Sequence, residues 1–289
     1  MADTSYTRLN RAVLSVAGED RRTFLQGLIS NDIAKAGPER AIFAAFLTPQ
    51  GKFLWDLFIV ESGDAFLIDV EAARIDDFRK KLSLYKLRAK VTIAVVDDMA
   101  VYAVLDPQAV GLPGEAGVAR PFADGVAMVD PRLPQLGARV LLKSPDALQA
   151  AGLTEAPFAA WDVLRLALGV PDGSRDLPVD KALLLENGFD ELGGVDFNKG
   201  CYMGQELTAR TKYRGLVRKR LLPVVIQGDT PEPGTLVMAG ELEAGEMRSS
   251  NGPVGLAMVR LEHLKSPLSA GGATLTVAVP DWMRLPEVE

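Results

Sequence analysis

The stretch AIFAAFLTPQGKFLWDLFIVESGDAFLIDV, residues Ala41 to Val70, contains three apolar runs separated by two turn signals. The TPQG segment follows the first run and the ESGD segment follows the second, and both are rich in the Gly, Pro, Ser and Asp residues that favour tight turns. Short apolar runs joined in this way predict an antiparallel meander of three strands. The meander indicates a fold built on antiparallel sheets.

Helical periodicity flanks the meander on both sides. RRTFLQGLI, residues 21–29, has apolar residues at helical spacing, and so has the segment Glu71 to Arg88. A further helix is predicted over residues 157–169, where Gly169 and Pro171 end it. Residues 91–96, 99–105 and 138–142 predict additional strands. The fold class is therefore α+β.

The texture changes after Gly215. Short apolar segments follow one another at intervals of roughly 10 residues, with Gly and Pro between them, which is typical of β-sandwiches and β-barrels. We predict a separate small β-barrel over residues 215–289.

Composition excludes several classes of function. The net charge of −6 argues against a general binder of polyanions. The longest apolar run, Ala41 to Leu47, is too short to cross a membrane, so no membrane contact is expected. One cysteine and one histidine cannot form a closed metal site, so no metal is expected. A chain without an internal disulfide or an apolar leader, with acidic residues near its start, is expected in the cytoplasm.

The single cysteine, Cys201, lies in FNKGCYMGQELTARTKYRG, residues 197–215. Lys199 lies two residues before the cysteine, and the residues from Met203 onward have helical character. A nearby cation and a helix N-terminus both favour the thiolate, which predicts an activated and partly exposed thiol. The alternative is a buried cysteine at a helix entry, where Gly200 and Gly204 serve only the turn. The residues alone leave both interpretations open.

Charged residues in unusual settings supply three more candidates. Six of the twelve residues from Ala209 to Arg220 are basic, which favours either an anionic ligand or RNA, or else a solvated face. Glu186 follows an apolar run and suits the donor edge of a heterocycle. Asp56 shares a strand face with Leu54 and Phe58, so it needs a partner or a ligand unless it faces water on an edge strand.

The segment KGCYMGQE, residues 199–206, resembles the signature of the YgfZ-type folate-binding proteins. These are relatives of the glycine-cleavage T-protein and of the mitochondrial factors that help to mature [4Fe–4S] enzymes. DRRTFLQGLISND, LTPQGKFLWDLFI, YKLRAKV and WDVLRLALGVPDGSRD are similar to the same family, so the resemblance covers nearly the whole chain. It implies a three-lobed cloverleaf of antiparallel sheets and helices around a central tetrahydrofolate cavity, with the C-terminal β-barrel as one lobe. The lobes would be residues 1–47 with 137–214, the inserted residues 48–136, and residues 215–289.

The resemblance also implies roles for individual residues. Cys201 and Lys199 would be the reactive pair, and Tyr202 and Gln205 would belong to the same folate site. The pterin would lie against Glu186, Asp56 nearer the middle of the folate, and Arg210 and Arg214 at its glutamate tail. One departure concerns the T-protein segment Gly-x-x-x-Asp-Asp. Here Gly51 to Asp56 has a tryptophan, Trp55, in place of one acid, which makes glycine cleavage doubtful.

Three functional interpretations follow. The first is a tetrahydrofolate-binding accessory factor for the assembly or repair of iron–sulfur enzymes, acting through Cys201. Its partners would be iron–sulfur enzymes or assembly proteins, and the basic run permits contact with tRNA where a client modifies tRNA. The alternative is a tetrahydrofolate-dependent one-carbon (aminomethyl) transferase that uses Asp56 as acid/base group. The third is a binding module without folate. The sequence leaves open whether any reaction is catalysed.

Overall fold

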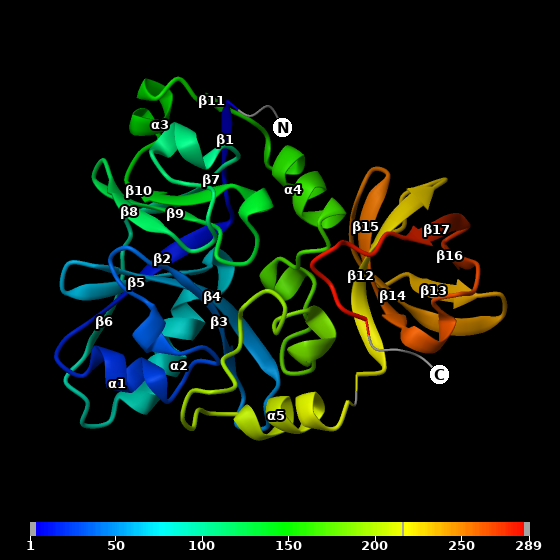
Figure 1. The fold of residues 1–289 in the computed structure, drawn as a ribbon, viewed down its shortest axis with the longest axis horizontal. Helices are drawn as coiled ribbons and strands as arrows, with labels where there is room; N and C mark the ends of the chain where they lie inside the picture. Colours follow the sequence, from blue (N-terminus) through cyan, green and yellow to red (C-terminus); the bar gives the residue numbers. More distant parts are fainter. Residues whose placement is uncertain (1–3, 216, 286–289) are drawn as a thin grey trace. The chain divides into compact units, whose positions relative to one another are not determined.

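The computed structural model describes residues 4–215 and 217–285 (Figure 1). The chain divides into two compact units. Unit 1 comprises Met1–Leu47, Leu54–Phe158 and Leu192–Met203, and unit 2 comprises Thr48–Phe53, Ala159–Glu191 and Gly204–Glu289.

Unit 1 contains two sheets. The first has five strands in the order β3-β4-β5-β2-β6, and it includes the meander predicted from Ala41 to Val70. Its strands β3, β4 and β5 lie side by side in the order of the three runs, the β4–β5 pair is antiparallel, and β2 pairs antiparallel with the other edge of β5. The strands are β2 (Arg11–Ala17), β3 (Ile42–Leu47), β4 (Phe53–Ser62), β5 (Ala65–Glu71) and β6 (Thr92–Val95).

The second sheet of unit 1 has six strands in the order β11-β1-β7-β10-β9-β8. All its pairs are antiparallel except the short parallel pair of β1 and β11. The strands are β1 (Ser5–Arg8), β7 (Ala100–Val104), β8 (Ala119–Phe122), β9 (Gly125–Val129), β10 (Ala138–Leu142) and β11 (Thr154–Glu155).

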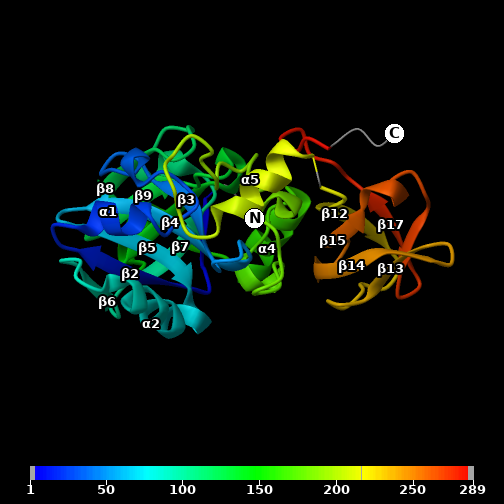
Figure 2. The ribbon, with the colours of Figure 1, turned by 90° about the horizontal axis from the view of Figure 1, so that it is seen from below.

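Helices cover these sheets. In Figure 2, α2 (Ile75–Lys86) runs beside β6 and β2, and its inner face buries Phe78 and Leu82. The Phe78 ring packs on Trp55 of β4 at a centroid distance of 5.3 Å, so the predicted amphipathic helix is confirmed. The other helices of unit 1 are α1 (Arg21–Gln26) and α3 (Asp146–Ala150), with 3-10 turns η1 (Ile33–Lys35), η2 (Ala72–Arg74), η3 (Pro107–Val110) and η4 (Pro134–Leu136).

Unit 2 contains a closed six-stranded barrel in the order β12-β15-β14-β13-β16-β17, which confirms the barrel predicted after Gly215. Buried apolar side chains of alternating strand positions, such as Leu222, Val224 and Ile226, fill its interior. The strands are β12 (Lys219–Gln227), β13 (Leu236–Ala239), β14 (Leu242–Asn251), β15 (Val254–Arg260), β16 (Leu268–Ala270) and β17 (Ala273–Val277). They are coloured from yellow to red in Figure 1.

Outside the barrel, unit 2 contains short helices joined by turns. The fully buried Arg165 of α4 pairs with Asp162 and Asp176, and Asp176 in turn accepts a hydrogen bond of 2.5 Å from Ser249 of β14. This chain of polar contacts fixes α4 to the barrel. The helices are α4 (Phe158–Ala167), α5 (Gln205–Tyr213), η5 (Gly173–Arg175), η6 (Leu185–Asn187) and η7 (Leu261–His263).

The α+β class with antiparallel sheets and a C-terminal barrel is therefore confirmed. The division into three lobes stays a prediction. Among the helices of residues 4–215 and 217–285, none is long and apolar enough to cross a membrane.

Candidate functional site: a thiol loop, a polar cavity and a buried ion network

Lys199 holds the loop that carries the cysteine. Its Nζ donates to the backbone oxygens of Gln26 at 2.8 Å, Ile29 at 2.7 Å and Asn31 at 2.7 Å. These bonds use all three donors of an ammonium group. The Nζ also lies 5.0 Å from the centroid of the Tyr202 ring. Lys199 therefore positions the loop, and its burial lowers the pKa of its amine to about 8.

Asp196 supports the same loop from the other side. Its Oδ1 accepts from the backbone N–H groups of Asn198 at 2.7 Å and Lys199 at 3.2 Å. Its Oδ2 lies 2.7 Å from Lys35 Nζ. Burial alone raises the pKa of Asp196, but the hydrogen bonds from Lys35 and Asn198 outweigh it and hold the pKa below its usual value.

Cys201 lies in this anchored loop and is exposed. After it, the N–H of Met203 donates to the backbone oxygen of Gly27 at 3.0 Å. The interpretation of a buried cysteine is therefore wrong, and the thiol stands between two fixed points. Because the three Lys199 donors go to carbonyl oxygens, the lysine acts on the loop geometry.

The second glycine of the motif has a packing reason. Gly204 has φ +80°, and a Cβ there would lie 2.4 Å from the backbone oxygen of Thr48. Gly51, in the turn after β3, has φ +82° and approaches the backbone of Gly204 in the same way. Only glycine, which has no Cβ, allows the two backbones to come this close. Helix α5 begins at the next residue, Gln205. A Cβ on Gly200 would meet nothing within 4 Å.

A shallow, open groove of about 650 Å³ lies along one face of α5, and its lining, which includes Glu206, comes from this helix and its last turn. It brings together three of the residues that the resemblance assigned to folate, Gln205, Arg210 and Arg214. Both arginines are exposed. The groove thus offers two guanidinium groups to an anion.

Glu186 lines a different cavity, of about 400 Å³, in unit 2. Burial raises the pKa of this carboxyl group, against the opposing effect of Lys219, whose Nζ lies 3.6 Å from Oε2. Asn187 and Arg248 also line the cavity, and Asn187 Oδ1 and Arg248 Nε are buried without a hydrogen-bond partner in the described chain. The sequence reasoning missed both residues, since neither has an unusual local setting.

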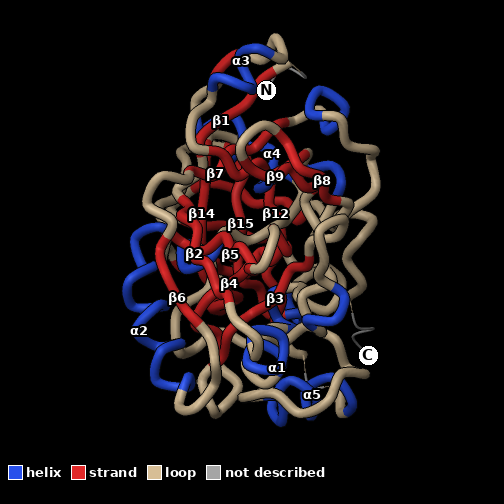
Figure 3. Tube along the Cα trace, turned by 90° about the vertical axis from the view of Figure 1, so that its left-hand side faces the viewer, coloured by secondary structure: helices blue, strands red, loops and turns tan. Residues whose placement is uncertain are grey.

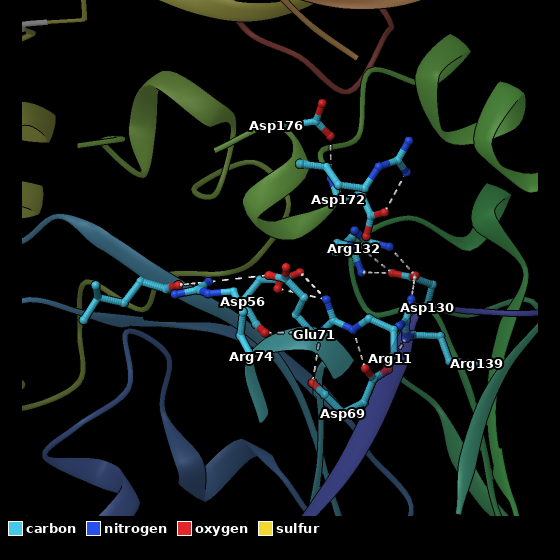
Figure 4. A network of polar contacts seen from close by, with 12 residues as sticks. Arg11, Asp56, Asp69, Glu71, Arg74, Asp130, Arg132, Arg139, Asp172 and Asp176 are labelled. Atoms are coloured by element: carbon cyan, nitrogen blue, oxygen red, sulfur yellow. Dashed lines mark hydrogen bonds and ion pairs between the residues drawn. The ribbon is translucent and has the colours of Figure 1, made fainter. Parts of the chain in front are cut away.

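Asp56 lies in a buried network of unit 1 (Figure 4). Its two carboxylate oxygens accept from Nη1 of Arg11 at 2.9 and 3.0 Å. The side chain is buried, and β4 lies inside its sheet, so the interpretation of an edge-strand aspartate facing water is wrong. The need for a partner, predicted from its apolar face, is met by Arg11.

The network continues from one sheet to the other. Arg11 Nε donates to Asp69 at 2.6 Å, and Asp69 accepts at 2.5 Å from Arg139 of β10. Arg139 and Arg132 both contact Asp130. Three carboxylates thus alternate with three guanidinium groups, and the Arg139 guanidinium lies 3.7 Å from the centroid of Phe58. Asp69 and Arg139 each stand in a strand of apolar residues, a signal that sequence reasoning used only for Asp56.

These features form separate clusters. Lys199, Cys201 and Tyr202 share the loop, Gln205, Arg210 and Arg214 share the α5 groove, Glu186 lies in its own cavity, and Asp56 belongs to the ion network. Within residues 4–215 and 217–285, no group of three or more His, Cys, Asp or Glu side chains is arranged to hold a metal ion.

Sequence comparison finds relatives along nearly the whole chain. The mitochondrial iron–sulfur cluster assembly factor IBA57 of Mus musculus is 34% identical over 309 residues, covering 98% of this chain and 86% of the mouse protein. The Homo sapiens IBA57 protein is 35% identical over 300 residues, covering 94% and 83%. Residues 218–285 match the family described as CAF17, C-terminal β-barrel domain, which agrees with the closed barrel.

Structural comparison finds the fold of the glycine cleavage system aminomethyltransferase T from Bartonella henselae. The crystal structure of that protein matches with a TM-score of 0.78 over 97% of this chain and 88% of the other, at 15% identity. At this identity the match shows a shared fold.

The expectation of a cytoplasmic protein is wrong on these comparisons, because the IBA57 relatives are named mitochondrial proteins. The features used for that expectation, such as the absence of an internal disulfide, did not discriminate between the cytoplasm and the mitochondrion. A lone cysteine shows only that no internal disulfide forms, which suits any reducing compartment.

Proposed function

Because this chain belongs to the family of IBA57 iron–sulfur cluster assembly factors, we propose that it acts through Cys201 as a tetrahydrofolate-binding accessory factor. Its partners would be iron–sulfur enzymes or assembly proteins, whose clusters it helps to assemble or repair. The KGCYMGQE segment, residues 199–206, favours the YgfZ-type branch of folate-binding proteins.

The observation that carries the proposal is the exposed thiol on an anchored loop. Cys201 is accessible, while Lys199 and Met203 fix the backbone on both sides of it. A thiol held in this way is positioned to contact a large partner at low entropic cost. A buried cysteine would have no such use.

One thiol supplies one cluster ligand. Iron–sulfur clusters need several thiolate or imidazole ligands, and the described residues offer no second cysteine near Cys201. The cluster is therefore cargo that a partner protein or a small thiol also holds. In this role Cys201 would contact the cluster during its transfer or repair.

The cavity of Glu186 fits a reduced pterin. Its volume of about 400 Å³ lies in the range of small-molecule sites. Glu186 would accept from the amino and N–H donors of the pterin edge, and Asn187 Oδ1 is an acceptor without a protein partner. The unpaired Arg248 Nε would donate to the pterin carbonyl oxygen. Bound tetrahydrofolate would supply one-carbon chemistry.

The α5 groove suits an anionic group such as the glutamate tail of a folate. Arg210 and Arg214 are exposed along it, and their guanidinium groups match the geometry of the carboxylates of a glutamate tail. The same two arginines permit contact with the phosphates of tRNA.

The shared fold with aminomethyltransferase T favours a second candidate, a one-carbon transferase. That function needs Asp56 as acid/base group. Both carboxylate oxygens of Asp56 accept hydrogen bonds from Arg11 inside a buried network, so they are already engaged and shielded from a substrate, which makes this candidate the weaker one.

The test is titration with tetrahydrofolate under anaerobic conditions, followed by tryptophan fluorescence. We expect Cys201→Ala to bind as the wild type does, and Glu186→Gln to bind at least tenfold more weakly because it loses a charged hydrogen-bond acceptor. Equal binding by Glu186→Gln would remove the pterin assignment. A wild-type protein that binds no reduced folate would favour a folate-free module.

A further inference from the structure

A basic and apolar surface lies at the C-terminal end of α2. Leu84 is 70% exposed and lies on the side of α2 that faces away from Phe78 and Leu82, and Leu87, the residue that follows the helix, is 89% exposed. Lys81, Lys86 and Arg88 surround them in the chain. We call these five residues the α2 patch. Figure 3 shows α2 on the outer side of the strands of unit 1.

The backbone under the α2 patch is strained. Leu87 has φ 42° and ψ −107°, and the N–H of Ala89 donates to the backbone oxygen of Lys86 at 2.7 Å. The four residues form a tight turn whose first central position has the positive φ that glycine prefers. A leucine in this backbone conformation is strained. Because its side chain is 89% exposed, packing offsets almost none of this strain energy. Folding alone therefore does not explain this leucine.

The charges of the patch also lack partners. Among the described residues, no ion pair involves Lys81, Lys86 or Arg88, whereas Lys90 pairs with Glu19 at 2.8 Å. The protein as a whole carries a net charge of −6. A local group of unpaired cations in an acidic protein attracts an acidic partner.

The helix beneath the patch is fixed. Phe78 and Leu82 are fully buried, and Tyr85 packs on Phe46 at a centroid distance of 6.0 Å. The apolar face of α2 thus packs on the sheet of unit 1, and Leu84 and Leu87 are the large apolar residues of this segment that stay exposed. Helices that lie on membranes bury a continuous apolar face, so two leucines suit a single pocket on a protein.

We propose that the α2 patch is a docking site for a partner protein whose surface has an apolar pocket with carboxylates around it. Leu84 and Leu87 fill the pocket, and Lys81, Lys86 and Arg88 face the carboxylates. This surface is additional to the thiol loop and does not depend on folate binding.

The first step of the test is site-specific photo-crosslinking of the full chain in its native cells. p-Benzoylphenylalanine replaces Ser83, which is exposed beside Leu84, or Ser269, an exposed serine of β16 that serves as the matched control. We expect one acidic protein to crosslink at position 83 and not at position 269. That protein is then identified, purified and titrated against the wild type and two variants.

The variant Leu87→Gly separates docking from folding. It relieves the positive φ, so we expect its melting temperature to rise by roughly 2–4 °C. Loss of the leucine side chain should weaken the binding of the crosslinked partner protein to the α2 patch by about tenfold. The variant Lys86→Glu/Arg88→Glu should also weaken binding and should reduce its dependence on salt.

Three results would overturn the proposal. The first is the absence of a crosslink specific to position 83. The second is unchanged affinity of the captured protein for both variants. The third is binding of phosphatidylglycerol vesicles by the wild type that the Lys86→Glu/Arg88→Glu variant loses, since this would assign the α2 patch to an anionic membrane.

Discussion

Replacement of Asp56 by asparagine tests whether this residue serves the structure or the chemistry. The buried network joins the carboxylates of Asp56, Asp69 and Asp130 to the guanidinium groups of Arg11, Arg132 and Arg139, and the charges of these six groups balance. Asp56→Asn leaves one uncompensated positive charge in a buried site. Removal of one member of a buried ion pair costs about 3–5 kcal/mol. We expect the free energy of unfolding to fall by that amount.

The assay is urea unfolding followed by tryptophan fluorescence. With a slope of about 2–3 kcal/mol per M urea, the midpoint should fall by roughly 1–2 M. Glu19→Gln is the matched control, because its pair with Lys90 is exposed on both sides and contributes about 1 kcal/mol or less. The double variant Asp56→Asn/Arg11→Met should lose less stability than the sum of the single variants, with a coupling of about 1–3 kcal/mol.

A free energy of unfolding for Asp56→Asn within about 1 kcal/mol of the wild type, together with an additive double variant, would rule out a structural role for the Asp56–Arg11 pair. Asp56 would then be free of Arg11 in solution. An acid/base role, and with it the transferase function, would regain its support.

Three further predictions concern the thiol loop and the cavity. The pKa of Lys199 is about 8 instead of 10.5, so the folded state holds fewer protons than the unfolded state between these values and stability should rise with pH through that window. Acetylation followed by mass spectrometry should give a midpoint near 8 for Lys199, and a midpoint at the ordinary value would contradict the burial argument. Gly204→Ala should destabilise the protein by about 1–3 kcal/mol because of its positive φ and the contact with Thr48, whereas Gly200→Ala should change stability by about 0.5 kcal/mol or less in thermal unfolding. Burial raises the pKa of Glu186 and so penalises its charged form. Glu186→Gln should therefore raise the melting temperature at pH 7 while it weakens tetrahydrofolate binding. A lower melting temperature would show that the carboxylate stabilises the fold.

Much of the fold follows from local patterns in the sequence. The meander from Ala41 to Val70, helix α2 and the barrel after Gly215 each have the period of their secondary structure, and each is present. The three-residue strand β16 was not predicted, since a strand of this length has no readable alternation.

The candidate site was less predictable, because its geometry depends on contacts distant in sequence. The Lys199 side chain reaches backbone oxygens about 170 residues earlier in the chain, which no local pattern encodes. The apolar surroundings of Asp56 signalled that it needs a partner, but they did not identify Arg11, which lies 45 residues away. The exposure of Cys201 also depends on the packing of its neighbours, and the sequence left it open.

If Cys201 acts on iron–sulfur clusters, its thiol is needed even in a protein that folds and binds folate normally. The most direct measurement is the activity of a [4Fe–4S] enzyme in cells that lack this protein, after they receive the wild type or Cys201→Ala. We expect Cys201→Ala to accumulate as a folded protein, to bind tetrahydrofolate like the wild type and to fail to restore the enzyme. Full restoration by Cys201→Ala would show that the exposed thiol has no part in the function.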